Sequence, residues 1–141
     1  MYYISIRFLF SEKTIFKEEN VTQKNFQNII FETKGEKSFL TINRPPLNIL
    51  NIAAMEEMNQ ALSSLAGNKE VKVLVISGGG EKAFSAGVDV ADHTADKAEK
   101  MLQVFHDIFR NMLKLDQVTV AALRGLTLGG GCEIALFCDL A

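Results

Sequence analysis

The stretch LGGGCEIALFCD, residues 128–139, joins three consecutive glycines to one acid and a mostly apolar run. Glycine lacks a Cβ, so it tolerates positive φ and lets a ligand or another segment approach the backbone closely. The apolar run predicts the start of a helix, and Glu133 would lie in its first turn, where the helix dipole favours negative charge. The pattern therefore indicates a loop that presents backbone N–H groups at a helix N-terminus, an arrangement suited to binding an anionic oxygen.

The segments before this stretch predict an α/β fold. Short apolar, β-branched runs are typical of buried parallel strands, and apolar residues at helical spacing indicate helices between them. Strand, loop and helix occur twice after a hairpin, so the helices would cross between near-parallel strands. The expected elements are a hairpin at residues 27–33 and 38–43 stopped by Pro45-Pro46, a helix from Asn51 to Gly67, a strand at 71–77, a helix from about 95 to 115, a strand at 118–123 and a helix from about residue 132.

Composition narrows the function classes. The chain has 141 residues, 48% hydrophobic and 23% charged, which fits one globular domain. A net charge of −2 gives no general attraction to nucleic acid or an anionic membrane. Cys132 and Cys138 have neither a CxxC nor a zinc-ligand spacing and are expected to be small core residues. No disulfide framework is expected, which indicates a reducing, cytoplasmic location. No run is long enough to span a bilayer.

The first 25 residues are interpreted as an extension outside the core, and residues 26–141 as the domain. The segment MYYISIRFLF is apolar but contains Arg7 and lacks the features of a signal peptide. The residues from Ser11 to Lys24 are mostly polar and show no periodicity. Regular patterning therefore begins at Phe26.

A second glycine-containing loop, FSAGVD at 84–89, follows the strand at 71–77. Neither loop matches a phosphate-binding GxxxxGK[ST] or GxGxxG motif. Ligands of open α/β sheets bind beyond the carboxyl ends of the strands, so each loop could direct one amide at the same oxygen, as in an oxyanion hole. Glu133 could then hold a water molecule or move a proton. The alternative is ordinary turn chemistry, with Glu133 simply favoured by the helix dipole.

Three motifs in order resemble the enoyl-CoA hydratase/isomerase (crotonase) superfamily. They are NRPPLNIL at 43–50, which is one residue shorter than the commonest version, KAFSAGVD at 82–89 and LGGGCEIALFCD at 128–139. The likeness extends from about Phe26 to Ala141 and corresponds to the N-terminal half of the family's chain. It implies a crotonase-like (ClpP/crotonase) α/β spiral of ββα units, with only the N-terminal part present. We therefore expect a fragment or a truncated reading frame.

The resemblance also implies a site. Family members hold an acyl-CoA carbonyl between two backbone amides, which here are those of Val88 and Gly130, and stabilise the enolate that forms. Glu133 matches the first of the two hydratase glutamates, whereas the second belongs to a segment that this chain does not contain. The residues expected along the CoA path are Leu47, Ile49, Ala86, Asp89 and Val90.

The implied function is addition of water to an enoyl-CoA, with CoA as part of the substrate and with no metal or redox cofactor. A complete family member would form a homotrimer or hexamer. PPLNILNIAAMEEMN, FSAGVDVADH and MLQVFHDIFRNM further resemble the cyclohexa-1,5-diene-1-carbonyl-CoA hydratases, which would imply a cyclic dienoyl-CoA. Isomerase, decarboxylase and thioester hydrolase chemistry remain open, and so does an inactive acyl-CoA-binding remnant.

The histidines and lysines are weaker candidates. His93 is expected on a solvent-facing loop, with the acyl pocket as the alternative, and His106 on a helix surface. Two histidines so far apart do not suggest a metal site. Lys69, Lys72 and Lys82 could contact CoA phosphates, although scattered lysines are usually solvated.

Overall fold

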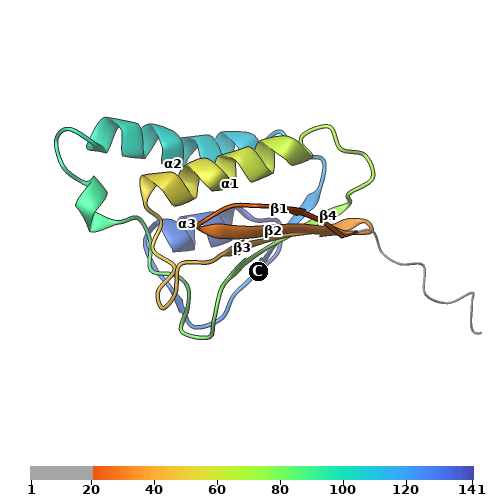
Figure 1. Cartoon of the computed structure of the whole chain (residues 1–141), viewed down its shortest axis with the longest axis horizontal. Helices are drawn as coiled ribbons and strands as arrows, with labels where there is room; N and C mark the ends of the chain where they lie inside the picture. Colours follow the sequence, from red (N-terminus) through yellow and green to blue (C-terminus); the bar gives the residue numbers. More distant parts are fainter. Residues whose placement is uncertain (1–20) are drawn as a thin grey trace, which may run out of the picture.

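The computed structural model describes residues 21–141 as a five-stranded sheet, a two-stranded sheet and helices (Figure 1). The elements are β1 Val21–Lys24, β2 Ile29–Lys34, β3 Lys37–Ile42, α1 Ile52–Leu65, β4 Val73–Gly78, β5 Ala83–Ser85, the 3₁₀ helix η1 Val90–Asp92, α2 Ala98–Met112, β6 Val118–Ala122, β7 Leu126–Thr127 and α3 Gly130–Phe137.

The larger sheet has the order β1-β2-β3-β4-β6. The first three strands pair antiparallel, whereas β3 pairs parallel with β4, and β4 pairs parallel with β6. The carboxyl ends of β3, β4 and β6 therefore meet at one edge of the sheet. The loops that leave these three ends gather at that edge, where ligands of open α/β sheets bind.

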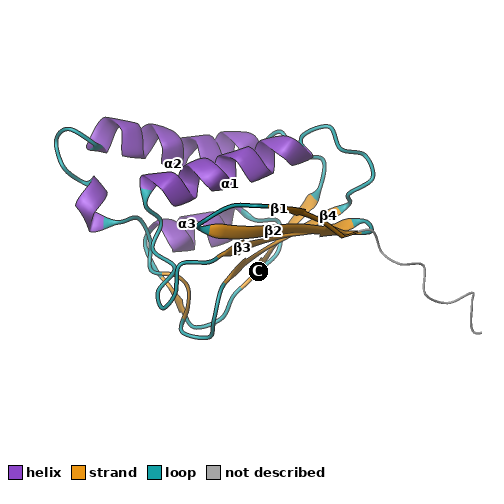
Figure 2. Ribbon diagram, viewed as in Figure 1, coloured by secondary structure: helices purple, strands orange, loops and turns teal. Residues whose placement is uncertain are grey.

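The core lies between the larger sheet and two long helices. Helices α1 and α2 pack against each other over one face of this sheet, and α3 lies toward one end (Figures 1 and 2). The apolar stripe of α1 buries Met55, Met58 and Leu62, and that of α2 buries Phe105 and Ile108. This burial on one stripe is what the helical spacing of apolar residues predicts.

Hydrogen bonds at the helix ends explain the bounds of the helices. Asn51 caps α1 as expected, since its Oδ1 accepts from the Ala54 N–H at 2.9 Å. Helix α2 is shorter than the predicted 95–115. At its end, the Lys114 and Leu115 amides donate to the carbonyls three residues back, at 3.1 Å each. This tighter turn ends the α-helix at Met112.

Three strands were not anticipated from the sequence: β1, and the short β5 and β7, which lie in segments that were expected to be loops. Strand β1 lies within the segment 1–25 that was interpreted as an extension, yet it pairs antiparallel with β2 in the register Val21↔Lys34. The sheet therefore begins several residues before Phe26. Residues 1–20 lie outside the described part of the chain, so the proposed division of domains stays a prediction.

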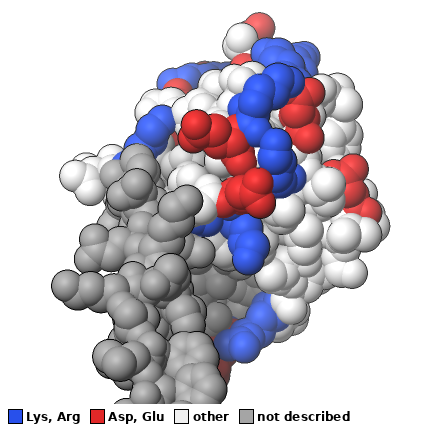
Figure 3. All heavy atoms as spheres, turned by 90° about the vertical axis from the view of Figure 1, so that its right-hand side faces the viewer, with Lys and Arg blue, Asp and Glu red and all other residues white. Residues whose placement is uncertain are grey.

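Acidic and basic side chains occur together at the end of the sheet that lies away from the carboxyl ends of β3, β4 and β6. On the face shown in Figure 3, acidic and basic residues are interspersed. Lys34 and Glu32 pair at 2.9 Å near the β2–β3 turn. The Lys69 ammonium donates a hydrogen bond to Asp116, and this bond and its positive charge lower the pKa of that carboxyl. No helix within residues 21–141 is long and apolar enough to cross a membrane.

Candidate active site

Asn48 fastens the loop after β3 to the segment after β4. It is fully buried, with a positive φ of 51° that asparagine tolerates better than most residues. Its Nδ2 donates to the Gly79 carbonyl at 2.9 Å and to the Ala83 carbonyl at 2.7 Å. Its Oδ1 accepts from the Arg44 N–H at 3.1 Å. The hydrogen bonds of Asn48 therefore fix the start of the loop at residues 84–89.

The segment around Val88 runs beside Leu50 as a short parallel bridge. The Leu50 N–H donates to the Gly87 carbonyl, and the Asp89 N–H donates to the Leu50 carbonyl, both at 2.9 Å. Successive peptide groups in an extended segment point to opposite sides, so the Val88 N–H faces away from Leu50. It has no acceptor among the described residues. One of the two predicted amides is thus available to a ligand.

The two glycine-containing loops touch through their backbones. Strands β5 and β7 pair in parallel, and the Leu128 N–H donates to the Ser85 carbonyl at 3.0 Å. A Cβ at Gly131 would lie 2.6 Å from that same carbonyl oxygen, and a Cβ at Gly87 would lie 3.1 Å from the Gly130 nitrogen. Such short distances explain why glycine is needed on both sides of the contact.

The Gly130 N–H is the second available amide. In the first turn of α3, the Gly131 N–H donates to Leu128 at 3.0 Å and the Glu133 N–H donates to Gly129 at 3.1 Å. The Gly130 N–H itself has no acceptor within residues 21–141, as is usual for the first amides of a helix. A Cβ at Gly130 would lie 2.9 Å from Val88 Cγ2. The structure therefore brings Val88 and Gly130 side by side, each with an unused N–H.

A cavity of about 470 Å³ opens beside these two amides. Glu133 contributes an exposed carboxylate to its wall, and α2 contributes an apolar part. His93 and His106, which the sequence placed on the surface, are both exposed, and both also line this cavity. The lining residues are Ala86, Gly87, Val88, His93, Met101, Leu102, Phe105, His106, Gly129, Gly130 and Glu133.

A second hollow of about 420 Å³ adjoins the same loop segment. Its lining residues are Asn28, Asn43, Arg44, Pro45, Pro46, Leu47, Ile49 and Asp89. Three of the residues expected along the CoA path, Leu47, Ile49 and Asp89, share this hollow. Ala86 lies instead in the larger cavity, and Val90 is 82% exposed and lines neither of the two. Asp89 also caps η1, since its Oδ1 accepts from the Ala91 N–H at 3.0 Å.

Sequence reasoning missed Arg44 in this hollow. Its Nη1 donates to the Ile49 carbonyl, which leaves other guanidinium donors for an anion. The sequence signal was an arginine directly before the two prolines. By contrast, Lys69 and Lys72 lie at the start of β4, at the opposite end of the strand from the loops. They are therefore poorly placed to contact a ligand held at this edge.

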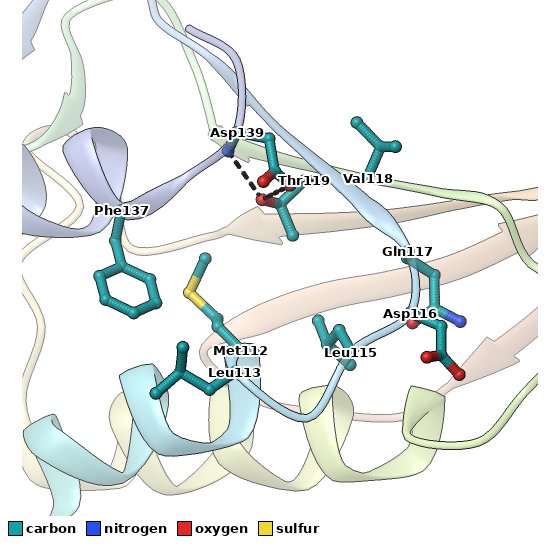
Figure 4. Close-up of a pocket in the computed structure, with 9 residues that line it drawn as sticks. All are labelled: Met112, Leu113, Leu115, Asp116, Gln117, Val118, Thr119, Phe137 and Asp139. Carbon is teal, nitrogen blue, oxygen red and sulfur yellow. Dashed lines mark hydrogen bonds between the residues drawn. The ribbon is translucent and has the colours of Figure 1, made fainter.

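Figure 4 shows a different cavity, of about 590 Å³, between the end of α2, the start of β6 and Phe137. None of the predicted site residues lines it. Asp139 accepts from the Thr119 N–H and hydroxyl, both at 2.7 Å, and these bonds lower the pKa of its carboxyl. Although this cavity is larger, the two predicted amides and Glu133 lie at the other cavity, so we place the candidate site at the loops.

Cys138 is poorly suited to act as a nucleophile. Burial raises the pKa of the Cys138 thiol to about 11, so the thiol stays protonated at neutral pH. Its Sγ donates to the Ile134 carbonyl at 3.4 Å, and the side chain packs against the core. Within residues 21–141, no group of three or more His, Cys, Asp and Glu side chains is arranged to hold a metal ion.

The chain is thus an α/β protein in which two loops each bring an unused backbone N–H to one cavity, with Glu133 in the cavity wall. The model of the Enoyl-CoA hydratase/isomerase family matches residues 32–141. The chain belongs to this family, which confirms the prediction from the three motifs.

Individual relatives agree with this membership. The chain is 36% identical over 117 residues to the short-chain-enoyl-CoA hydratase of Clostridium acetobutylicum, covering 80% of this chain and 45% of the relative. It is 35% identical over 118 residues to the crotonyl-CoA hydratase of Syntrophomonas wolfei, covering 81% and 45%. The chain thus spans about half the length of these relatives. Neither is named for a cyclic dienoyl-CoA, so they give the narrower resemblance no support.

Solved structures agree on the fold. The chain matches DspI of Pseudomonas aeruginosa with a TM-score of 0.76 and 31% identity, covering 82% of this chain and 45% of that one. It matches an enoyl-CoA hydratase of Bacillus anthracis with a TM-score of 0.74 and 30% identity, covering 80% and 46%. The described residues therefore form the N-terminal part of the crotonase fold, as predicted.

Proposed function

We propose that this chain binds an acyl-CoA thioester and takes part in adding water to an enoyl-CoA. The observation that carries the proposal is the pair of unused N–H groups on Val88 and Gly130, held side by side by loops in direct backbone contact. Two neighbouring amides, one from a loop and one at a helix N-terminus, suit an oxygen that gains negative charge. A donor of this kind contributes about 3–4 kcal/mol, or 10²–10³ in rate.

Besides the two amides, the reaction needs a group that holds the water and moves protons. The oxygen of water bonds to the β-carbon and gives one proton to a carboxylate, and the π electrons move onto the thioester oxygen held by the two amides. The α-carbon of the resulting enolate then takes a proton from that carboxylic acid, so that one water is added in all. Glu133 lines the same cavity and has no ion-pair partner within the described residues, so its carboxylate is free to hold the water or move a proton. Addition of water is not a net oxidation or reduction, and the two amides can polarise the carbonyl, so we propose that neither a redox cofactor nor a metal is needed.

The substrate follows from the two hollows and from the relatives. The acyl group would occupy the cavity of about 470 Å³, and CoA would follow the hollow that contains Arg44, whose guanidinium suits a phosphate. The relatives' names favour a short-chain enoyl-CoA such as crotonyl-CoA over a cyclic dienoyl-CoA. We further propose a cytoplasmic enzyme that assembles as the trimer or hexamer implied by the resemblance.

One observation favours a second candidate function. Glu133 is the only carboxylate that the described residues place in the cavity wall, whereas hydratases use two glutamates. A protein that binds acyl-CoA but does not catalyse hydration would need no second carboxylate in the cavity. Isomerase, decarboxylase and hydrolase chemistry would use the same pair of amides but gain no such specific support.

A spectroscopic assay separates these functions. Hydration of crotonyl-CoA, or of a cyclic dienoyl-CoA, removes conjugation and lowers the ultraviolet absorbance, while calorimetry measures binding of butyryl-CoA. We expect Glu133→Gln to lower the hydration rate by at least two orders of magnitude, while Glu36→Gln, in the exposed β2–β3 turn, changes neither measurement. Binding without hydration would support the second candidate. Absence of acyl-CoA binding would refute both.

A further inference from the structure

The ring of His93 is held in place by one of its two nitrogens. His93 directly follows η1, and its N–H donates to the Val90 carbonyl at 3.1 Å. Its ring Nδ1 lies 2.9 Å from the Asp89 carbonyl oxygen. A carbonyl oxygen can only accept a hydrogen bond, so Nδ1 must carry the proton. The bond thereby selects one tautomer of the neutral ring.

The second nitrogen is consequently a hydrogen-bond acceptor. In a neutral imidazole that is protonated on Nδ1, Nε2 carries a lone pair. No described residue donates to it. His93 lines the same cavity as Val88, Gly130 and Glu133. The neighbouring α2 part of the wall contains the apolar residues Met101, Leu102 and Phe105, together with His106.

The 3₁₀ helix η1, which directly precedes His93, is hydrogen-bonded to the start of α1. Asp92, directly before His93, is 8% exposed and accepts from the Ile52 N–H at 2.9 Å, which ties η1 to the start of α1. The Lys97 ammonium lies 3.6 Å from the other oxygen of Asp92. His106 has no comparable tether, since its ring nitrogens have no hydrogen-bond partner within the described part of the chain. Of the two histidines, only His93 therefore has a ring tautomer that is set by a hydrogen bond.

We propose that His93 is a specificity-determining residue whose Nε2 accepts a hydrogen bond from a hydroxyl on the acyl group. The hydroxyl in question is the one that hydration places on the β-carbon. This inference rests on the proposed function, because it takes the cavity as the acyl site. A 3-hydroxyacyl-CoA would then bind more tightly than the corresponding saturated acyl-CoA.

Two substitutions separate this role from a structural one. Asparagine can place its amide near the position of Nδ1 and can keep the bond to Asp89, but it has no group at the position of Nε2. Glutamine reaches the position of Nε2 but not that of Nδ1. Calorimetry with 3-hydroxybutyryl-CoA and butyryl-CoA gives an affinity ratio for the unmodified protein, His93→Asn and His93→Gln. We expect His93→Asn to reduce this ratio about five-fold and His93→Gln to retain it, as befits one net hydrogen bond.

An unchanged ratio in the asparagine variant would overturn the inference. If His93 matters only through its bond to Asp89, the asparagine variant keeps the ratio and the glutamine variant weakens both ligands equally. A ratio that is the same in all three proteins, with both ligands bound, refutes the role of His93 but leaves the proposed function standing. Failure of the unmodified protein to bind either ligand refutes the proposed function, and this inference with it.

Discussion

Replacing Asn48 with alanine tests whether one buried side chain holds the loops of the candidate site. The side chain of Asn48 makes three hydrogen bonds: two to the carbonyls of Gly79 and Ala83, and one from the N–H of Arg44. It also sits at a positive φ of 51°. The Ser85 hydroxyl donates to the Asn48 carbonyl at 2.7 Å and accepts from the Gly87 N–H at 3.1 Å. Asn48 is therefore connected to the loop that carries Val88.

The expected loss of stability follows from these contacts. Each lost hydrogen bond costs about 1 kcal/mol net, and buried groups left without a partner cost somewhat more. Alanine at positive φ adds roughly 1 kcal/mol. Asn48→Ala should therefore lower the free energy of unfolding by about 4 kcal/mol, which is a large part of the 5–15 kcal/mol typical of a domain. Asn48→Gly avoids the backbone strain, so it should lose about 3 kcal/mol.

Urea unfolding and butyryl-CoA binding measure the two consequences. Asn59 provides a matched control, because its Nδ2 donates to the Val104 carbonyl at 2.8 Å between α1 and α2, away from the loops. Asn59→Ala should lose about 1–2 kcal/mol and keep its affinity for the thioester, whereas Asn48→Ala should lose affinity as well. An Asn48→Ala protein within about 1 kcal/mol of the unmodified one, with unchanged binding, would show that Asn48 does not hold the loops.

Two further predictions concern packing and ionisation. Gly131→Ala should destabilise the protein by at least ~1 kcal/mol and weaken thioester binding, because its Cβ would lie 2.6 Å from the Ser85 oxygen. In most helices a Gly→Ala change is stabilising, and that result here would contradict the close contact. In a Cys132→Ser background, Cys138 should react slowly with iodoacetamide at pH 8 and faster toward pH 11, because burial raises its pKa to about 11. Since the pKa is raised on folding, stability should fall as pH increases from about 9 to 11. Rapid labelling of the folded protein at pH 8 would disprove this.

The regular elements were largely predictable from the sequence because their signals are local. The helical spacing of Met55, Met58 and Leu62 marks α1 whatever the rest of the chain does, and Asn51 caps it within one turn. The hairpin was predicted to within a few residues. Strand β1 was missed because VTQK lacks an alternating apolar pattern, and its place is set by pairing with β2.

Some residues of the candidate site were predictable from local motifs, and others were not. The sequence singled out Val88, Gly130 and Glu133 through glycine-rich motifs, and the structure places all three at one cavity. It gave weak signals for Arg44 and His93, because the roles of both depend on neighbours. An arginine before two prolines and a histidine after a turn are common, and only the folded loops show what surrounds them.

The sequence alone determined the class of fold and the order of the longer strands and helices, which follow from periodicity and turn chemistry within short windows. Its three motifs marked the family by their resemblance to known members. Only the tertiary structure decided how the loops meet. The β5–β7 pairing and the bonds of Asn48 to Gly79 and Ala83 join segments 31 or more residues apart. Such contacts depend on the register of β3, β4 and β6, because parallel pairing of these strands brings their carboxyl ends, and the loops that follow, to one edge.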